Sequence, residues 1–596
     1  MNPFVQEIAK LISNLTDLSF EEVVKLITTP PNEQLGDYAF PCFVLSQRLK
    51  KPPEEIAGEL VKLLSPRSSA AVDGAGKNFH LEQLPVKLQG ELLTEARNIG
   101  PYLNFFVDKT KLVQYTLEQI LSQAERYGKS TEGKGKTVVI DFSSPNIAKP
   151  FSIAHLRSTA IGNALKNIYR ALGYHVIGVN HLGDWGTPQG KMIVAYTRWG
   201  SKERVEKDSI YELYRLYVKF GEEAEKDPTL LEEARSAFKR LEQGNPQALE
   251  LWRWFEHESL KAFERYYETL GVQFEEIRGE SVYRDQTETL IAKLIKLGIA
   301  RESQGAIVVP FEDEKLPPLI LSKRDGATTY ATRDLCAAIY HYEKYRFDKK
   351  LYVVDAGQAL HFQQLFKTLE LMGHEWAKDL THVPFGVLLF EDERMASRRG
   401  KIVFLEEVLN QSIARVSTII ETIKKTAELS EEEKEEVSRD VGVSAVIYAD
   451  LSRSRTHDIN FRWEDVLNFN GKSGPYIQYT HARFAGVLRK SSLQVDTLAS
   501  SQVDFSKLSH SNEVSLVKHL EKFPAKVHEA AEKYEPFVIS DYLGDLAILA
   551  NQFYDSCRVL GEEPSLEQAR LALVYCTKVV LKNGLELLGM KAPERM

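Results

Sequence analysis

The sequence has few cysteines and no long hydrophobic run. Its four cysteines are far apart among 596 residues, which excludes a disulfide framework and a zinc knuckle of closely spaced pairs. No stretch stays apolar over the roughly 20 residues that a membrane-spanning helix needs. We expect a protein without membrane contact and without a structural metal, in which the cysteines are small buried residues. The cysteines are Cys42, Cys336, Cys557 and Cys576.

The sequence also lacks a signal peptide and an excess of basic residues. The N-terminal stretch MNPFVQEIAKLISNL carries Glu7 among its apolar residues, so we expect a cytoplasmic location. The formal net charge is −8, but a nucleic-acid partner requires only a local basic patch. Residues 451–490 are one candidate, with seven Lys or Arg against three Asp or Glu, although a solvated helix face explains them better on charge alone.

The length of the chain predicts two to four domains. Residues 1–110 are typical of a small α/β domain. Residues 111–404 alternate strand and helix patterns and contain a charged helical insertion near 205–270. Residues 405–596 have almost only helical patterns. We therefore expect three domains: a small α/β domain, an α/β domain with an insertion, and a helix bundle.

A strand, a helix and a second strand follow one another in the middle domain. The β-branched run TVVIDF starts at Thr137, a helix with apolar residues four apart covers 155–173, and a strand covers 175–183. Such a unit is parallel and right-handed, and it begins a doubly wound, Rossmann-like sheet. The nearby GKGKT at 133–137 is not a phosphate-binding loop, because it precedes a strand and Ser130 stands where that motif needs glycine. Further strands are expected at 306–312, 318–323, 350–355 and 382–390, and further helices at 332–345 and 360–373.

The stretch DFSSPNIAKPFSIAHLRST at 141–159 joins the first strand to the helix and has the composition of a phosphate site. Ligands bind at the carboxyl ends of parallel strands, and the N–H groups at a helix start attract anions. His155 can donate to a phosphate, Lys149 supplies a positive charge, and the small residues Ser152 and Ala154 let a flat ring approach. Taken alone, however, a histidine at a helix start is more often a surface residue.

Five motifs in a fixed order carry a resemblance across the whole chain. SIAH at 152–155 stands where class I aminoacyl-tRNA synthetases have their HIGH signature, and its surroundings are similar to the arginyl-tRNA synthetase version. The match runs from GDYAF at 36–40 to the last residue, so it is strong although each motif alone is weak. The other motifs are HLGDWG at 181–186, DGATTYATRD at 325–334, GQALHFQQLF at 357–366, and SGPYIQYTHAR at 473–483 with APERM at 592–596.

The resemblance implies an arginine–tRNA ligase. Such an enzyme joins L-arginine to ATP, bound as its Mg²⁺ complex, forms an arginyl-adenylate, and transfers arginyl to the 3′ end of tRNA(Arg) with release of AMP and pyrophosphate. Monomers are usual in this family. In-line attack on the α-phosphorus depends on positioning and on charge stabilisation. This chemistry suits a helix N-terminus with a histidine and lysines better than it suits a catalytic triad.

The resemblance also assigns the ATP site. RMASRRGK at 394–401, which includes Arg399, stands where the class has its KMSKS loop, and a solvated charged loop is the alternative. The implied catalytic residues are His155, Lys149, Arg394, Arg398 and Lys401. The implied ATP-binding residues are Ser152, Ala154, His155 and Met395.

Recognition of arginine needs a carboxylate opposite its guanidinium. By resemblance this is Asp334, although without the motif an exposed carboxylate at a helix start is the better explanation. Tyr330 stands four residues earlier, so the two would share one side of the helix if it begins at Tyr330 and not at 332. Asp184 and Trp185 in HLGDWG are expected to shape the pocket or to be structural. The implied arginine-binding residues are Asn146, Glu280, Tyr330, Asp334 and Gln358.

Contacts to tRNA are implied at both ends of the chain. Tyr102 and Asn104 match positions that stack on and hydrogen-bond an adenine of the D-loop. It is equally probable from the sequence that they are ordinary strand residues. In the last domain, Tyr479, Tyr554 and Met596 match positions near the anticodon, although Tyr554 is equally compatible with the core.

The sequence departs from the family pattern at four positions. Ser152 replaces the first histidine of the signature, and Ala154 replaces its glycine, which puts a methyl group toward the expected adenine. Arg394 and Ala396 replace Lys and Ser of the second motif. We predict retained activity with weaker ATP binding. The alternatives are a tRNA-binding protein with an impaired active site and another nucleotidyl transferase of the same fold.

Overall fold

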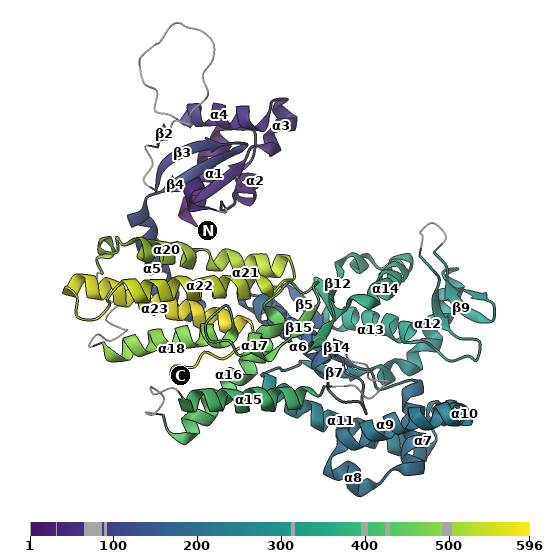
Figure 1. Cartoon of the computed structure of the whole chain (residues 1–596). Helices are drawn as coiled ribbons and strands as arrows, with labels where there is room; N and C mark the ends of the chain where they lie inside the picture. Colours follow the sequence, from purple (N-terminus) through teal and green to yellow (C-terminus); the bar gives the residue numbers. More distant parts are fainter. Residues whose placement is uncertain are drawn as a thin grey trace. The chain divides into compact units, whose positions relative to one another are not determined.

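A computed structural model describes most of the chain. The described residues are 2–30, 32–64, 86–88, 92–311, 316–391, 393–394, 403–422, 429–491 and 503–596. They form two compact units, coloured along the chain in Figure 1. The first unit comprises Met1–Ser122, Asp496–Glu521 and Cys557–Leu573, and the second comprises Gln123–Val495, Lys522–Ser556 and Val574–Met596. This division differs from the three domains expected from the sequence, because parts of the last segment cluster with the first.

The first unit is built on an antiparallel sheet of order β1-β4-β3-β2. Its apolar core joins Phe4 and Ile8 from a helix to Leu60 from another helix and to Phe105 from the sheet, and all four are buried. Asn2 caps the first helix, since its side chain accepts from the N–H groups of Phe4 and Val5. The elements are α1 (Pro3–Leu15), α2 (Phe20–Leu26), β1 (Tyr38–Pro41), α3 (Phe43–Leu49), α4 (Pro53–Leu64), β2 (Val86–Lys87), β3 (Leu93–Ile99), β4 (Tyr102–Val107) and α20 (Ser511–Glu521), with α5 (Lys109–Gln123) leading out.

The second unit contains a five-stranded parallel sheet of order β12-β11-β5-β6-β7. From β5 the chain moves to β6 and β7 in one direction and later to β11 and β12 in the other, as expected for a doubly wound sheet. Because crossovers are right-handed, the connecting helices α6 and α14 cover opposite faces. The elements are β5 (Thr137–Asp141), α6 (Ile153–Ala171), β6 (His175–Leu182), β7 (Glu276–Gly279), α13 (Tyr330–Tyr345), β11 (Lys349–Asp355), α14 (Ala359–Leu371) and β12 (Leu380–Phe385).

Between β6 and β7 the chain forms the helical insertion expected near 205–270. Its apolar core includes Trp185, Leu216, Phe238 and Phe255, all of them buried. The indole of Trp252 donates to the backbone oxygen of Asp184 at 2.7 Å, which joins the insertion to the HLGDWG segment. The helices are α7 (Thr187–Trp199), α8 (Lys202–Lys207), α9 (Ser209–Lys226), α10 (Thr229–Glu242) and α11 (Pro246–Leu270).

Smaller elements complete the sheet domain. The turn η3 (Glu280–Tyr283) and α12 (Arg284–Lys296) follow β7, and a short antiparallel sheet joins β8 (Arg301–Ser303), β9 (Ala306–Val309) and β10 (Leu319–Ser322). A second small sheet of order β14-β13-β15 lies on the path to the helices. Its strands are β13 (Leu388–Phe390), β14 (Glu393–Arg394) and β15 (Ile459–Phe461).

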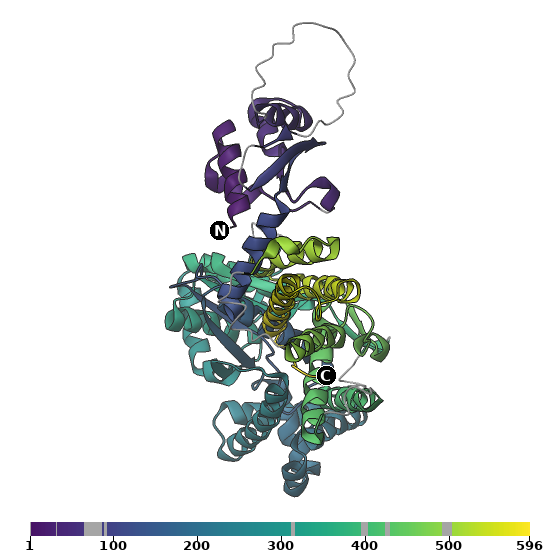
Figure 2. The same cartoon turned by 90° about the vertical axis from the view of Figure 1, so that its left-hand side faces the viewer.

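Helices dominate the chain after residue 404, as expected. Helices α18 and α22 pack side by side, and Figure 2 shows them close to end-on. The helices are α15 (Leu405–Thr422), α16 (Glu431–Leu451), α17 (Trp463–Val466), α18 (Gly474–Lys490), α21 (Phe523–Glu532), α22 (Phe537–Ser556) and α23 (Pro564–Leu587). All four cysteines are among the described residues, are buried and form no disulfide, which confirms their expected role. Of the described helices, none is both long enough and apolar enough to cross a membrane.

Candidate active site

A cleft of about 460 Å³ opens at the carboxyl edge of the parallel sheet, where β5 and β11 lead to opposite sides. Ligands of doubly wound sheets bind at such a point. The volume is within the range of small-molecule sites. Four segments line the cleft: Ser143–Ser144 after β5, Ala154–His155 at the start of α6, Val353–Asp355 at the end of β11, and 385–388 after β12.

The backbone that leaves β5 is strained. Ser143, Ser144 and Ala148 have φ values of 71°, 48° and 57°, in the left-handed region that residues with a Cβ rarely adopt. Hydrogen bonds hold this turn, since the N–H of Ser143 donates to Ser158 Oγ at 2.8 Å and that of Ser144 donates to Asn180 Oδ1 at 3.1 Å. Strain that the surroundings enforce in this way is typical of functional sites.

His155 faces the cleft as a neutral imidazole. Its Nδ1 accepts the backbone N–H of Ser152 at 3.1 Å, so Nε2 is the nitrogen that carries the proton. Burial, and to a smaller extent the positive charge of Lys149, lower the pKa of His155 to about 4. The ring is therefore a hydrogen-bond donor at neutral pH without being a cation. Ala154 beside it is exposed and lines the same cleft.

The loop implied by resemblance lies mostly outside the described residues. Arg394 is the last residue of β14, and nothing of its side chain is described. The positions of Met395, Arg398 and Lys401 in that loop stay predictions. On the other side of the site, the ammonium of Lys149 lies 5.1 Å from the ring centroid of Tyr217, which holds this cation near the start of α6.

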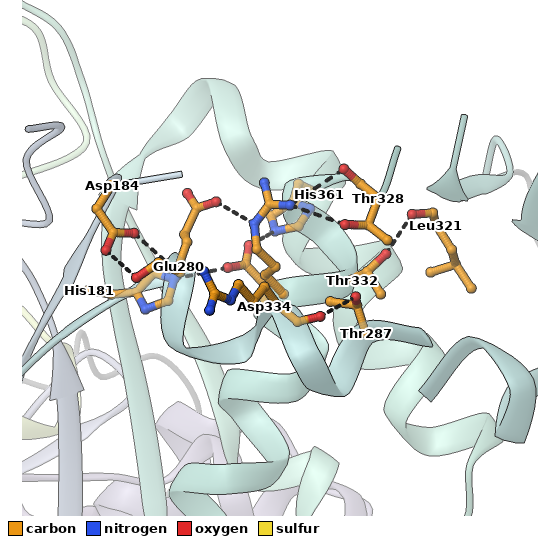
Figure 3. Close-up of polar contacts among 12 residues, drawn as sticks. His181, Asp184, Glu280, Thr287, Leu321, Thr328, Thr332, Asp334 and His361 are labelled. Carbon is orange, nitrogen blue, oxygen red and sulfur yellow. Dashed lines mark hydrogen bonds and ion pairs between the residues drawn. The ribbon is translucent and has the colours of Figure 1, made fainter. Parts of the chain in front are cut away.

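A second set of charged residues lies along the same edge of the sheet (Figure 3). Helix α13 begins at Tyr330, two residues before the expected start at 332, so Tyr330 and Asp334 share one side of its first turns. The Asp334 carboxylate contacts His361 Nε2 at 2.8 Å and His181 Nε2 at 3.4 Å. Although burial raises its pKa, the hydrogen bonds from these two histidines hold the pKa of Asp334 well below its usual range. The Tyr330 ring lies 4.8 Å from that of His361 and is 50% exposed.

Glu280 lies next to this carboxylate and already has a partner. Its Oε2 accepts from Arg333 Nε at 2.6 Å, and Arg333 is 5% exposed. Burial raises the pKa of Glu280, and the charge of Arg333 opposes that effect. Asp184 is also buried and accepts the N–H of Ser281 at 2.8 Å, which supports a structural role for it.

Asn146 and Gln358 are exposed at the ends of neighbouring strands. Asn146 forms an isolated bridge with Gly183, just after β6, and Gln358 ends the short turn that follows β11. Both can therefore contact a ligand at this edge. The sequence did not single out His181, His361 or Arg333, although His181 and His361 belong to the quoted motifs HLGDWG and GQALHFQQLF and Arg333 to DGATTYATRD.

Asp141 connects the cleft to the charged set. Ser144, which lines the cleft, donates its hydroxyl to Asp141 Oδ1 at 3.0 Å. The Asp141 carboxyl is buried, so its pKa is raised, and it interacts electrostatically with His181 and with Asp334. Asp141 therefore links the cleft, through Ser144, to the charged residues around Asp334.

The residues expected to contact tRNA lie in several places. In the first unit, Tyr102 is 39% exposed and packs its edge against Phe43 at 5.7 Å, whereas Asn104 is only 3% exposed. Asn104 can reach a base only if its surroundings open, so its role stays a prediction. In the second unit, the guanidinium of Arg483 lies 4.7 Å from the ring centre of Tyr479 and 4.9 Å from that of Tyr554.

Met596 packs against an apolar cluster of α15 and α16 that contains Val416, Ile420, Val437 and Val441. Its expected position near an anticodon stays a prediction.

Three family models match the chain in order. A model described as class I tRNA synthetases (R), catalytic domain, matches residues 116–463. A model described as the DALR anticodon binding domain matches 477–596, and one described as the arginyl tRNA synthetase N terminal domain matches 4–81. The first match alone covers more than half of the chain.

Similar proteins agree with these models. An arginine–tRNA ligase of Clostridioides difficile is 45% identical over 99% of this chain and 100% of its own, and one of Halothermothrix orenii is 43% identical over 100% of both. The arginyl-tRNA synthetase of Thermus thermophilus covers 100% of both chains with a TM-score of 0.80 at 24% identity, which confirms the expected fold class. The motifs, the site and these matches lead to one conclusion: the chain belongs to the arginyl-tRNA synthetase family.

Proposed function

We infer that the chain is an ATP-dependent ligase that joins L-arginine to tRNA(Arg). In the first step the carboxylate of arginine attacks the α-phosphorus of ATP, the bond to the bridging oxygen breaks, and pyrophosphate leaves. In the second step the terminal ribose hydroxyl of the tRNA attacks the arginyl carbonyl, and AMP leaves. The observation that carries this proposal is that Asp141 links the cleft at the start of α6 to the charged residues around Asp334, by a hydrogen bond from Ser144 and by electrostatic interactions with His181 and Asp334.

The cleft supports a role in binding ATP. His155 Nε2–H is free to donate to a phosphate oxygen, because Nδ1 already accepts from Ser152. A neutral donor stabilises the negative charge that develops in the transition state without taking a proton from the solvent. Lys149 adds a positive charge nearby, and Mg²⁺ enters bound to the phosphates of ATP. Arg394, Arg398 and Lys401 are proposed to cover the pyrophosphate.

The acidic pocket supports a role in binding arginine. The Asp334 carboxylate has lone pairs beyond those that face the two histidines, so it can accept a guanidinium in bidentate fashion. Tyr330 is half exposed beside it and offers a ring or a hydroxyl. Glu280, Asn146 and Gln358 are proposed to hold the remaining polar groups of the amino acid.

The tRNA-binding roles are extended from the sequence in the same way. Tyr102 and Asn104 are proposed to read a D-loop base, and Tyr479, Tyr554 and Met596 are proposed to lie near the anticodon. We further propose three functional domains at 1–110, 111–404 and 405–596, a monomeric state, and a cytoplasmic location.

Arginine-dependent exchange of pyrophosphate into ATP tests the function, with and without tRNA(Arg). We expect exchange with arginine that tRNA supports, and charging of tRNA(Arg) but of no other tRNA. Asp334→Asn should raise the KM for arginine at least 100-fold and leave the KM for ATP near its original value, because a charged hydrogen bond to the guanidinium is lost. Exchange with a different amino acid, or none with arginine, would overturn the proposal.

A further inference from the structure

Two imidazole rings already contact the Asp334 carboxylate, where the cationic guanidinium of arginine is proposed to bind. Each carboxylate oxygen of Asp334 faces one ring in the absence of substrate: Oδ2 faces His361 at 2.8 Å and Oδ1 faces His181 at 3.4 Å. His181 is in β6 and His361 is in α14, so the two rings approach from different elements and fix the plane of the carboxylate (Figure 3).

His181 is a cation when the site is empty. Burial alone would lower its pKa, but Asp334 at 3.4 Å and the charges of Asp141 and Glu280 raise the pKa to about 9. Its side chain is 14% exposed, so little solvent stabilises that charge. The proton on His181 therefore depends mainly on Asp334.

Other charged groups surround the ring on every side. Strand β5 contributes Asp141, β11 contributes Lys350, η3 contributes Glu280, and α13 contributes Asp334, Arg333 and His341, with Arg278 of β7 nearby. Most of these groups already have a partner: Glu280 pairs with Arg333, and Lys350 contacts His341 Nδ1 at 2.6 Å. His361 of α14 completes the set. Asp334 is thus the carboxylate that His181 and an incoming cation must share.

We propose that His181 is a positioning residue that serves as the charge partner of Asp334 in the empty pocket and gives its ring proton to solvent when the guanidinium of L-arginine takes that place. This inference rests on the proposed function, in which Asp334 binds the guanidinium. A guanidinium that is hydrogen-bonded to Asp334 is about 5 Å from His181, and repulsion at that distance in a partly buried site lowers the proton affinity of the ring about 100-fold. The guanidinium itself keeps its charge, because it cannot be deprotonated in a protein.

The loss of the charge on His181 explains how one carboxylate selects a guanidinium. His361 stays on Oδ2 and holds the carboxylate plane, while His181, once neutral, leaves Oδ1 to the guanidinium. A cation that binds weakly or at the wrong distance leaves His181 protonated and is repelled by its positive charge. A ligand must therefore interact with Asp334 more strongly than charged His181 does. A bidentate guanidinium meets this condition, and a poorly placed ammonium does not.

Titration calorimetry of L-arginine into the full-length protein, without ATP or tRNA, tests the proposal. The observed enthalpy at pH 7.5 is compared in phosphate and in Tris, whose ionisation enthalpies differ. At pH 7.5 we expect about 0.7 proton released per arginine bound, because the ring is almost fully protonated in the free protein and about one quarter protonated in the complex. For the same reason the dissociation constant should fall about fivefold from pH 7 to pH 8.

Three controls separate the causes. L-Citrulline has an uncharged urea in place of the guanidinium, so it should bind without proton release. His181→Gln should bind arginine without release, whereas His361→Gln should retain the release. If His181→Gln fails to bind arginine, the contrast between arginine and citrulline in the original protein decides the question.

Equal enthalpies in the two buffers for the original protein, or undiminished release in His181→Gln, would overturn the proposal while arginine binding itself stands. Arginine binding that Asp334→Asn does not weaken would instead overturn the proposed arginine pocket. The two failures are therefore distinguishable.

Discussion

Arg157 and Asp450 form a buried ion pair, with 2.9 Å between Nε and Oδ1 and side chains that are 1% and 0% exposed. Arg157 is on α6, two residues after His155, and Asp450 is near the end of α16. The same guanidinium donates to the backbone oxygens of Gly386 at 2.8 Å and His457 at 2.9 Å. Since Gly386 lines the cleft, one side chain joins α6, the cleft wall and the helical segment.

This pair predicts strong coupling in stability. Arg157→Met or Asp450→Leu leaves one buried charge without its partner, so each should cost about 3–5 kcal/mol, whereas the double variant should lose clearly less than the sum. Denaturant unfolding followed by circular dichroism measures this. Arg198→Met is the control, because its pair with Glu233 is 43% exposed at both ends and should contribute at most about 1 kcal/mol. Additive losses in the double variant would contradict the coupling.

The depressed pKa of His155 predicts a pH dependence of stability. Below about pH 6.5 an unfolded histidine binds a proton, but folded His155 stays neutral until about pH 4. The unfolded state therefore binds more protons in this interval, and stability falls as the pH is lowered through it. In His155→Asn the melting temperature should fall less between pH 7 and pH 5 than in the original protein. Parallel losses in both would show that His155 titrates normally.

The methyl group of Ala154 predicts weakened ATP binding. This residue is exposed at the cleft, where the family pattern has glycine. Ala154→Gly should lower the KM for ATP about fivefold, because a group of about one methylene in a contact changes affinity by about that factor. The same substitution should cost up to about 1 kcal/mol in helix stability. Pyrophosphate exchange at varied ATP concentration measures this effect. Ala154→Ser keeps the bulk and should give no gain, and an unchanged KM in Ala154→Gly would refute the steric argument.

The exposed ring of Tyr102 predicts a contribution to tRNA binding from the first unit. Tyr102→Ala should weaken the affinity for tRNA(Arg) about tenfold, because stacking on a base contributes about 1–3 kcal/mol. Tyr102→Phe keeps the stacking surface and should bind almost normally. Filter binding at a fixed salt concentration measures both variants, with arginine activation as a check of the active site. Equal affinities for Tyr102→Ala and the original protein would favour an ordinary strand residue.

The guanidinium of Arg483 predicts a second tRNA contact. It lies near both the Tyr479 and the Tyr554 rings and donates to Asn551. Arg483→Met should separate the two rings and reduce charging of tRNA(Arg) about tenfold, whereas Arg483→Lys should restore only part of it, because an ammonium does not stack. Kinetics with a tRNA(Arg) whose anticodon is altered provide the comparison. A loss that is equal for both tRNAs would place the contact outside the anticodon.

The local pattern of the sequence was sufficient for much of the fold. Alternation and four-residue spacing identified the strand at Thr137, the helix after His155 and the parallel strand that follows. The helix that became α13 was also predicted, although it begins at Tyr330 and not at 332, and this earlier start places Tyr330 and Asp334 on one side. These features depend on residues within a few turns of each other, where periodicity and turn chemistry decide the structure.

The sequence by itself determined the family, the fold class and the motifs that meet at one sheet edge. Only the tertiary structure decided which charged residues of those motifs pair with one another. His181, Asp334 and His361 come from β6, α13 and α14, and Arg157 and Asp450 come from helices in separate halves of the second unit. Such pairings follow from strand order and helix packing, because a carboxylate takes the partner that burial places nearest to it, and chain distance carries no information about that partner.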